Sequence, residues 1–509
     1  MNIIKSTSTF GFFTLISRIL GYLRDLFIAI YIGSGPIADA FFVAFRIPNT
    51  FRRLFSEGSF NSAFVPSYSS ELNKSKIKAN IFANNVFNLL FAFLVIIIIF
   101  IELFMPLFIY IIAPGFIENT EKLNLTILLT RITFPFLLFV SLASFFSAIL
   151  NSHNKFAVAA GAPIILNIFL ILVLFYGKYL NDELVIYLSY AVSLAGLIQL
   201  IFLIVCTRKL FSPKLNFKFK IGNNVKVFFK KLLPSIFSSG VTQINILVGT
   251  IIASFQASAV SYLYYADRIY QINLAIAGIA IGTVILPNLS KHINSNKLDK
   301  INLIQNKALE LSLFLSLPAT FALIIAAEEI TSALFGYGSF DLESIKNSSQ
   351  ALFYFALGLP AFSLIKIFSS FLFARNNTKT PFHFSIIAVI LNILISIIFF
   401  KKLGFIIIPI ATTISSWFNS FLLYLYLSKK NYFNFNKDQL LPIFKIIISV
   451  FITNLIFYFL INIFSSYLEY GNQYKLLTII ILVIFTFLTY LSISIMTKAF
   501  KISDIKLKY

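Results

Sequence analysis

The sequence predicts an all-α, polytopic membrane protein with about 14 transmembrane helices. Of its 509 residues, 59% are hydrophobic and 12% are charged, whereas a soluble domain has about 25% charged residues. The apolar stretches are also continuous, as in the runs 87–104 and 478–496. Transmembrane β-strands alternate apolar and polar residues over about ten positions, so continuous runs favour helices.

The apolar runs recur along the whole chain. A helix that crosses a bilayer needs roughly 20 residues of this kind. The predicted spans lie near residues 10–33, 36–70, 81–112, 124–150, 156–177, 184–206, 228–254, 260–289, 303–335, 348–373, 381–400, 404–427, 440–465 and 475–497.

The net charge of +22 is explained mostly by topology. With both termini in the cytoplasm, the lysines and arginines outside the spans concentrate in the cytoplasmic loops, which is the positive-inside pattern. Nucleic acid is therefore not an expected partner, and the basic loops offer a secondary surface for anionic lipid. The opposite loops carry Lys122, Lys178, Lys346, Lys401, Lys402 and Lys475.

An internal repeat divides the spans into two halves. Four residues recur at a constant offset of 225: Pro135, Ser144, Asn151 and Asn167 reappear as Pro360, Ser369, Asn376 and Asn392. Two repeated halves around a central site are a common transporter architecture. We therefore expect two six-helix bundles around a central cavity and two further C-terminal helices, arranged as 1–206, a basic cytoplasmic linker 207–231, 232–430 and 431–509.

Charged residues lie inside the first two predicted spans, between Ser17 and Tyr68. Ionisable residues in a membrane span are costly and usually functional. Five arginines face three acids in this stretch, and their positions are Arg18, Arg24, Arg46, Arg52, Arg53, Asp25, Asp39 and Glu57.

Helical spacing places several of these charges on common faces. Residues seven apart on a helix stay within about 20° of one face, so Asp39, Arg46 and Arg53 form one stripe. Pro48 removes a backbone donor and Gly58 weakens the helix, so we expect this span to bend or open.

The excess of arginine indicates an anionic ligand. Arginine stays charged and binds phosphate in a bidentate manner. Arg268, the counterpart of Arg46 in the repeat, adds a cation from the second half, beside Asp267. The alternative is that all these charges only pair with one another to hold the helices together. For Asp267 and Ser261 a structural role is also open, and Lys366 is either a cavity cation or one partner of an ion pair.

Metal, cofactor and enzymatic chemistry find little support in the sequence. The chain has one cysteine, Cys206, and its three histidines fall in loops or at the ends of spans. It has no phosphate-binding glycine loop with its lysine and no nucleophile elbow. We therefore predict a transporter without a metal or cofactor, rather than an enzyme.

At these residues the sequence resembles a known family. The segments SRILGYLRD, DAFFVAFRIPNTFRRLFSEGSFNSAFVPSY, APGF, ITFPFLLFVSLASFFSAILN, YYADR and ILPNLS are similar to those of the MurJ (MviN) lipid II flippases. These belong to the multidrug/oligosaccharidyl-lipid/polysaccharide exporter superfamily. The resemblance covers most of residues 1–400 in the same order, and the last hundred residues match in hydropathy.

The resemblance implies a flippase in the bacterial inner membrane. Its substrate would be undecaprenyl-pyrophosphate-linked MurNAc-pentapeptide-GlcNAc, which alternating access would move to the outer leaflet for peptidoglycan synthesis. Membrane lipids would surround the protein, and a monomer is one candidate for its oligomeric state. It implies a hydrophobic groove for the prenyl tail in the last two spans. The family's functional positions carry over to this sequence as Arg18, Arg24, Ala29, Asp39, Arg52, Glu57, Ser261 and Arg268. We predict that the substrate-binding residues are Arg18, Arg24, Arg52, Arg268 and Ser261, that the gating or ion-pairing residues are Asp39, Glu57, Asp25, Arg53 and Asp267, and that Ala29 provides close helix packing.

One departure from the family concerns ion coupling. Some relatives are thought to bind sodium through acids in spans seven and eleven, but the spans 228–254 and 381–400 contain no Asp or Glu. Coupling to membrane potential therefore fits this chain better than sodium. The alternatives are a flippase for another polyprenyl-linked saccharide, of the O-antigen or teichoic type, and a MATE-like exporter.

Overall fold

The computed structural model describes residues 3–54, 60–180, 183–216, 222–274, 281–295, 297–433 and 440–499, and these are helical throughout apart from turns and short connections. They fall into two compact units, 1–260 and 261–509. Each unit is described by itself. The predicted four-part division into bundles, linker and C-terminal helices stays a prediction.

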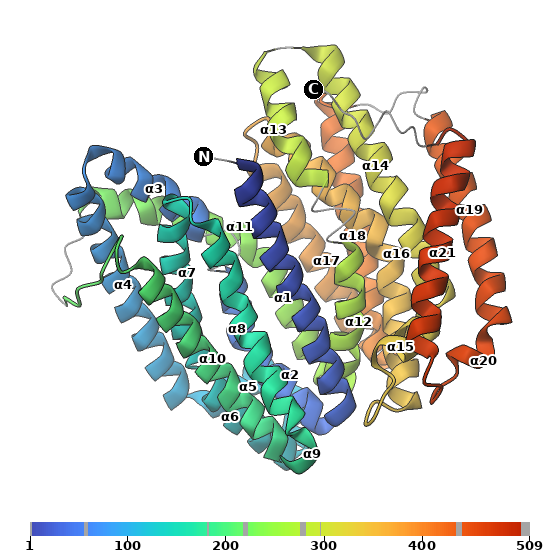
Figure 1. Cartoon of the computed structure of the whole chain (residues 1–509), viewed down its shortest axis with the longest axis horizontal. Coiled ribbons are helices and arrows are strands. Elements are labelled where there is room, and N and C mark those ends of the chain that lie inside the picture. The colour runs from blue at the N-terminus through green and yellow to red at the C-terminus, as the bar shows by residue number, and fades with distance from the viewer. Residues whose placement is uncertain are drawn as a thin grey trace. The chain divides into compact units, whose positions relative to one another are not determined.

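Unit 1 contains the helices coloured from blue to green in Figure 1. They are α1 (Ile3–Tyr31), α2 (Pro36–Leu54), α3 (Phe60–Lys74), α4 (Lys76–Leu103), α5 (Met105–Ile112), η2 (Pro114–Glu118), α6 (Thr120–Thr133), α7 (Phe136–Ser152), α8 (Phe156–Phe175), α9 (Gly177–Leu180), α10 (Leu184–Thr207) and α11 (Asn223–Ala253).

Unit 2 contains the remaining helices, and α12 begins two residues before its boundary. They are α12 (Ala259–Leu274), α13 (Ile281–Asn294), α14 (Leu298–Ile325), α15 (Ala327–Phe335), α16 (Leu342–Phe373), α17 (Lys379–Leu403), η5 (Gly404–Ile406), α18 (Ile407–Lys429), α19 (Leu440–Ile463), α20 (Ser465–Leu468) and α21 (Lys475–Met496).

By length and composition, nine helical segments among the described residues could cross a membrane. Their large apolar side chains are exposed in many places, as at Phe93, Phe451 and Phe485, which suits contact with lipid. The all-α fold class is confirmed, whereas the count of fourteen spans stays a prediction. Several predicted single spans comprise two helices: 36–70 contains α2 and α3, 81–112 contains α4 and α5, and 303–335 contains α14 and α15.

Unit 1 is organised by long helix pairs and an aromatic cluster. Helix α1 packs along α8, α10 packs against α7 and α8, and α2 packs against α6 (Figure 1). Phe64 of α3 stacks near Phe82 of α4, Phe145 of α7 and Phe228 of α11, with ring centroids 5.1–6.1 Å apart. Van der Waals packing of such rings stabilises contacts between helices in a bilayer, where the lipid tails are as apolar as the rings.

The first part of the predicted basic linker, up to residue 216, packs on unit 1. Asn88 of α4 donates to the carbonyl of Lys214 at 3.1 Å and accepts from the amide of Asn216 at 3.2 Å. Phe211 is 3% exposed and its ring lies 5.8 Å from that of Phe145. This segment therefore belongs to the packed body of unit 1.

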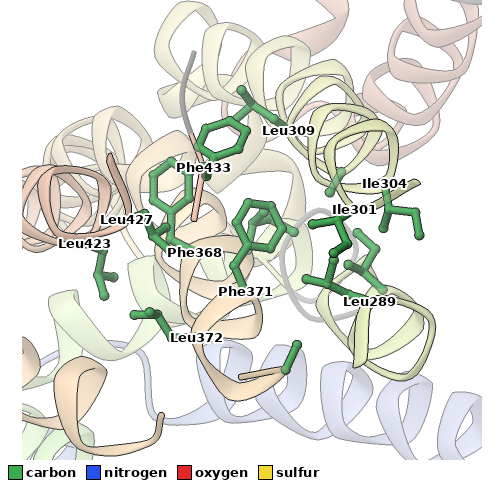
Figure 2. Packing of buried hydrophobic residues seen from close by; sticks show 14 residues of the cluster. Leu289, Ile301, Ile304, Leu309, Phe368, Phe371, Leu372, Leu423, Leu427 and Phe433 are labelled. Atoms are coloured by element: carbon green, nitrogen blue, oxygen red, sulfur yellow. The ribbon is translucent and has the colours of Figure 1, made fainter. Parts of the chain in front are cut away.

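Unit 2 has a comparable core near the ends of α16 and α18. Figure 2 shows how Phe433, which follows α18, lies close to Phe368 and Phe371 of α16, with centroid distances of 6.1 and 5.6 Å. Phe433 is 222 residues after Phe211. In each unit an aromatic residue beyond the last helix of the repeat fills the core. The cluster in Figure 2 also contains Leu289, Ile301, Ile304, Leu309, Leu372, Leu423 and Leu427.

Prolines inside helices leave backbone carbonyls that neighbouring hydroxyls bind. Pro48 has no N–H for the carbonyl of Ala44, four residues earlier, and the Thr133 hydroxyl of α6 donates to that carbonyl at 3.1 Å. In unit 2, Pro318 frees the carbonyl of Phe314 in the same way, and the Tyr490 hydroxyl of α21 donates to it at 2.9 Å. Each bond ties two helices together.

Candidate functional site

Arg24 lies at the centre of a buried network in unit 1. Its Nε and Nη2 donate to Asp25 Oδ1 at 3.0 and 2.7 Å, and its Nη1 donates to Asn167 Oδ1 at 3.0 Å. Its guanidinium carbon also lies 5.6 Å from the ring centroid of Phe45. Arg24 and Asp25 are only 6% and 3% exposed. The network therefore joins α1, α2 and α8 around one guanidinium.

Two other predicted residues of α1 have contrasting environments. Arg18 is exposed and makes no ion pair or hydrogen bond with any other residue of the described chain. It shares its helical face with Asp25, as the seven-residue spacing predicts. Ala29 is fully buried on the same helix, and its role in close packing stays a prediction.

Asp39 forms a second buried ion pair. Its Oδ2 accepts from Lys122 Nζ of α6 at 2.6 Å, and the exposed fractions of the two side chains are 0% and 7%. The ammonium also lies 3.8 Å from the centroid of the Phe116 ring in η2. Sequence reasoning placed Lys122 in an outer loop and missed this role. The APGF motif lies just before Asn119, the residue that caps the N-terminus of α6. It was the sequence feature that could have pointed to Lys122.

The structure describes only some of the other charged side chains of α2. Arg46 donates to the Thr250 hydroxyl of α11 at 2.5 Å, so the predicted stripe contacts α6 at Asp39 and α11 at Arg46. Arg53 is half-buried. The side chain of Arg52 and the whole of Glu57 lie outside the described residues, and their predicted roles stay predictions.

In unit 2, the predicted residues lie on α12. Arg268 donates to the Tyr264 hydroxyl at 2.9 Å, and its guanidinium carbon lies 4.6 Å from the centroid of that ring. Asp267 accepts a hydrogen bond from Gln271. Ser261 is fully buried. Ring and hydroxyl together hold Arg268 against its own helix.

Lys366, whose role the sequence left open, is exposed on α16. Its ammonium makes no ion pair within the part of the chain that the structure describes. Among the described residues, no group of three His, Cys, Asp or Glu could hold a metal ion.

His153 follows α7 and contacts Tyr68, whose Oη lies 3.3 Å from its Nε2. Partial burial, together with Lys155 and Lys76, lowers the pKa of His153 below its usual value. The imidazole is therefore held in its neutral form at neutral pH.

Comparison with known proteins decides the family. The family model described as lipid II flippase MurJ matches residues 28–501. A probable lipid II flippase MurJ of Rickettsia prowazekii (strain Madrid E) is 38% identical over 477 residues, which cover 92% of this chain and 93% of that protein. The chain belongs to the MurJ family of lipid II flippases. The family membership predicted from the motifs is thus confirmed.

Further MurJ proteins give the same answer, and a MATE transporter shares the fold. A probable lipid II flippase MurJ of Rhizobium meliloti (strain 1021) is 39% identical and covers 83% of this chain and 80% of its own. A solved structure of lipid II flippase MurJ in an inward closed conformation has a TM-score of 0.80 at 28% identity, covering 96% of this chain and 98% of that one. An inward-facing MATE transporter has a TM-score of 0.67 at 15% identity, covering 81% and 94%, which shows a shared fold.

The network around Arg24 contains one residue that sequence reasoning noticed for another reason. Asn167 was found only as a member of the internal repeat, and nothing in its neighbourhood along the chain connects it to Arg24, 143 positions away. Its contact depends on how α8 packs against α1. The MurJ motif in α1 was recognisable, whereas its partner in α8 was not.

Proposed function

We propose that this chain is a lipid II flippase, a transporter that moves the lipid-linked peptidoglycan precursor from the inner to the outer leaflet of the bacterial cytoplasmic membrane. The observation that carries the proposal is the Arg24 network on the scaffold of the MurJ family. A guanidinium buried in a membrane protein and held by a carboxylate and an amide is a preorganised group for an oxyanion. The diphosphate of lipid II is such an anion.

Each predicted cation has a distinct role in this proposal. Arg18, which is exposed, makes the first contact with the diphosphate, and Arg24 binds it within the membrane. Arg52 of unit 1 and Arg268 of unit 2 are further binding residues, with Ser261 as a polar contact. A diphosphate carries several oxygens that can each accept from a different arginine.

The acids oppose these cations when substrate is absent. Asp25 accepts two bonds from Arg24, so the arriving diphosphate competes with a carboxylate for the same guanidinium. We propose the same function for Glu57 and Asp267 and propose Arg53 as a cationic partner in these ion pairs, while Asp39 is neutralised by Lys122. A ligand shifts a conformational equilibrium only when it binds the two conformations of the protein with unequal affinity. When the diphosphate replaces the carboxylate at Arg24, this exchange therefore couples substrate binding to alternating access.

The remaining features of the proposal concern the membrane. Both termini lie in the cytoplasm, the four-part organisation into two bundles, a linker and two C-terminal helices holds, and the exposed apolar faces of α19 and α21 contact the prenyl tail. The protein transports its substrate unchanged and is not an enzyme. A lipid II substrate is favoured over other polyprenyl-linked saccharides because relatives at 38% and 39% identity carry that name.

The test is replacement of the native flippase in a depleted bacterium. The wild-type chain should restore growth and the access of an externally added lipid II-cleaving protein to its substrate. Arg24→Ala and Arg268→Ala should insert into the membrane in normal amounts and restore neither. Full restoration by both variants would show that the arginines do not form the anion site. Growth without any change in lipid II access would point to another saccharide carrier.

A further inference from the structure

Asn167 links the backbone of one helix to the guanidinium of Arg24. Its Nδ2 donates to the carbonyl oxygen of Ser17 on α1 at 3.0 Å, while its Oδ1 accepts from Arg24 Nη1 at 3.0 Å. The residue is 6% exposed. Because the amide nitrogen of Asn167 donates to a carbonyl, the amide oxygen is the atom that faces Arg24, and it accepts from the guanidinium.

The packing of α1 against α8 makes this geometry possible. Gly21 lies one turn after Ser17 on α1, and a Cβ at that position would meet Asn167 Nδ2 at 3.8 Å, an ordinary contact distance. A larger side chain there would reach into the space of the amide. The small residue therefore lets Asn167 approach both Ser17 and Arg24.

The bonds to Asn167 and Asp25 leave part of the guanidinium available. Arginine has five N–H donors. Three of them are used, two by Asp25 and one by Asn167. The second hydrogen of each terminal nitrogen has no acceptor within the residues that the structure describes. Since the plane of the group is fixed on two sides, the directions of these two donors are fixed as well.

We propose that Asn167 is a positioning residue, which holds Arg24 in the orientation that binds the diphosphate of the substrate. This rests on the proposed function of Arg24. A neutral amide is suited to the task because it orients the guanidinium and leaves its charge intact, whereas a second carboxylate would neutralise it. Fixing the donor in advance removes the cost of ordering it on binding.

The repeat supplies a matched control. Asn392 of α17 occupies the position equivalent to Asn167 and is equally buried, at 6% exposed. Its amide donates to the Thr412 hydroxyl at 3.1 Å and accepts from the Ser396 hydroxyl at 3.1 Å. These partners are neutral, so the same substitutions at Asn392 change the packing of a buried amide without changing an arginine.

The experiment compares Asn167→Asp, Asn167→Leu, Asn392→Asp and Asn392→Leu in the full chain. Two quantities are measured in detergent: the affinity for lipid II and the thermal unfolding midpoint. Asn167→Asp should still fold, because an aspartate can accept from Arg24, although its midpoint should fall by a few degrees since it can no longer donate to the Ser17 carbonyl. Its affinity should fall by about tenfold or more, because a second carboxylate beside Arg24 opposes the negative charge of the diphosphate. The Asn392 variants should bind lipid II as the wild type does.

The aspartate variant separates positioning from packing. If Asn167 only packed the helices, Asn167→Leu would lower the midpoint and Asn167→Asp would bind normally, which would overturn the proposal. Arg24→Gln serves as the reference for the anion site. If it binds lipid II normally, the proposed function of Arg24 is wrong; if it loses binding while both Asn167 variants retain it, only the positioning role is wrong.

Discussion

Asn167 in unit 1 and Asn392 in unit 2 occupy equivalent positions of the repeat, yet they bind different partners. Asn167 contacts a charged arginine and a backbone carbonyl, and Asn392 contacts two hydroxyls. The two units therefore share a buried amide in a helix, and in unit 1 this amide accepts from a charged guanidinium. We propose that the repeat preserves the amide in both copies and that unit 1 uses it to position Arg24.

Two equivalent aromatic residues also occupy matching places in the two units. Phe211 and Phe433 fill the cores of their units in the same way. Against this common framework, unit 1 buries the pairs Arg24–Asp25 and Asp39–Lys122. Buried ion pairs contribute little to stability compared with apolar packing, because desolvation of the charges offsets their attraction. Their presence in unit 1 fits the role in transport that we propose for this unit.

The largest effect is expected from Lys122→Met. The change leaves the Asp39 carboxylate buried without its ammonium partner, which costs about 3–5 kcal/mol. Thr412→Val in unit 2 removes one neutral partner of Asn392 and should cost about 1 kcal/mol. Unfolding of the detergent-solubilised protein measures both. The double variant Asp39→Asn/Lys122→Met should recover most of the loss, and a single variant as stable as the wild type would contradict the buried pair.

The difference in charge between the units also predicts how transport is driven. Unit 2 has no Asp or Glu between Glu343 and Asp438, so we expect no sodium site built from carboxylates in that region. Replacing external sodium by choline should change lipid II flipping less than about twofold, whereas dissipating the membrane potential should reduce it strongly, since one charge crossing 100 mV corresponds to about 2.3 kcal/mol. Strict dependence on sodium at constant potential would refute this.

A feature present in both units should give matched effects. Thr133→Val and Tyr490→Phe each remove the hydroxyl bound to a carbonyl freed by proline. Each change leaves a buried carbonyl unsatisfied and should cost about 1–3 kcal/mol of unfolding free energy. Chemical denaturation of both variants tests this. A loss of unfolding free energy in one unit and none in the other would show that the two hydroxyls do not stabilise the carbonyls freed by proline to the same extent.

The smallest effect concerns His153 of unit 1, whose equivalent position in unit 2 is Thr378. Its pKa is lowered by burial and by two lysines, so the unfolded chain binds the proton more readily. Stability is therefore complete above pH 6.5 and falls as the pH drops through the usual histidine value. NMR titration should give a midpoint below 6.5, and His153→Gln should remove this part of the pH dependence. A midpoint at or above 6.5 would contradict the assigned environment.

The sequence predicted those features that depend on local pattern. Continuous apolar runs predicted the helices, and the motif around Arg24 predicted the family, because both are read along the chain. Partners contributed by distant helices could not be predicted in this way. Asn167 and Lys122 become functional candidates only when α8 packs on α1 and α6 packs on α2.

The breaks within helices were also hard to predict from hydropathy. The segment 303–335 was predicted as one span, but α14 ends at Ile325 and α15 begins at Ala327. Pro318 lies inside α14 without ending it. A proline or an apolar run thus says less about where a helix ends than the tertiary bonds around it, because a neighbour can satisfy the freed carbonyl.

The aromatic cluster of unit 1 bears on how the chain is made. Its members Phe60, Phe64, Phe82, Phe145 and Phe228 are all synthesised before unit 2 begins. A ribosome that has reached residue 260 has therefore delivered every ring that this core needs. Unit 1 can bury its arginines while the second copy of the repeat is still being translated, and membrane insertion need not hold those charges exposed until the whole chain is complete.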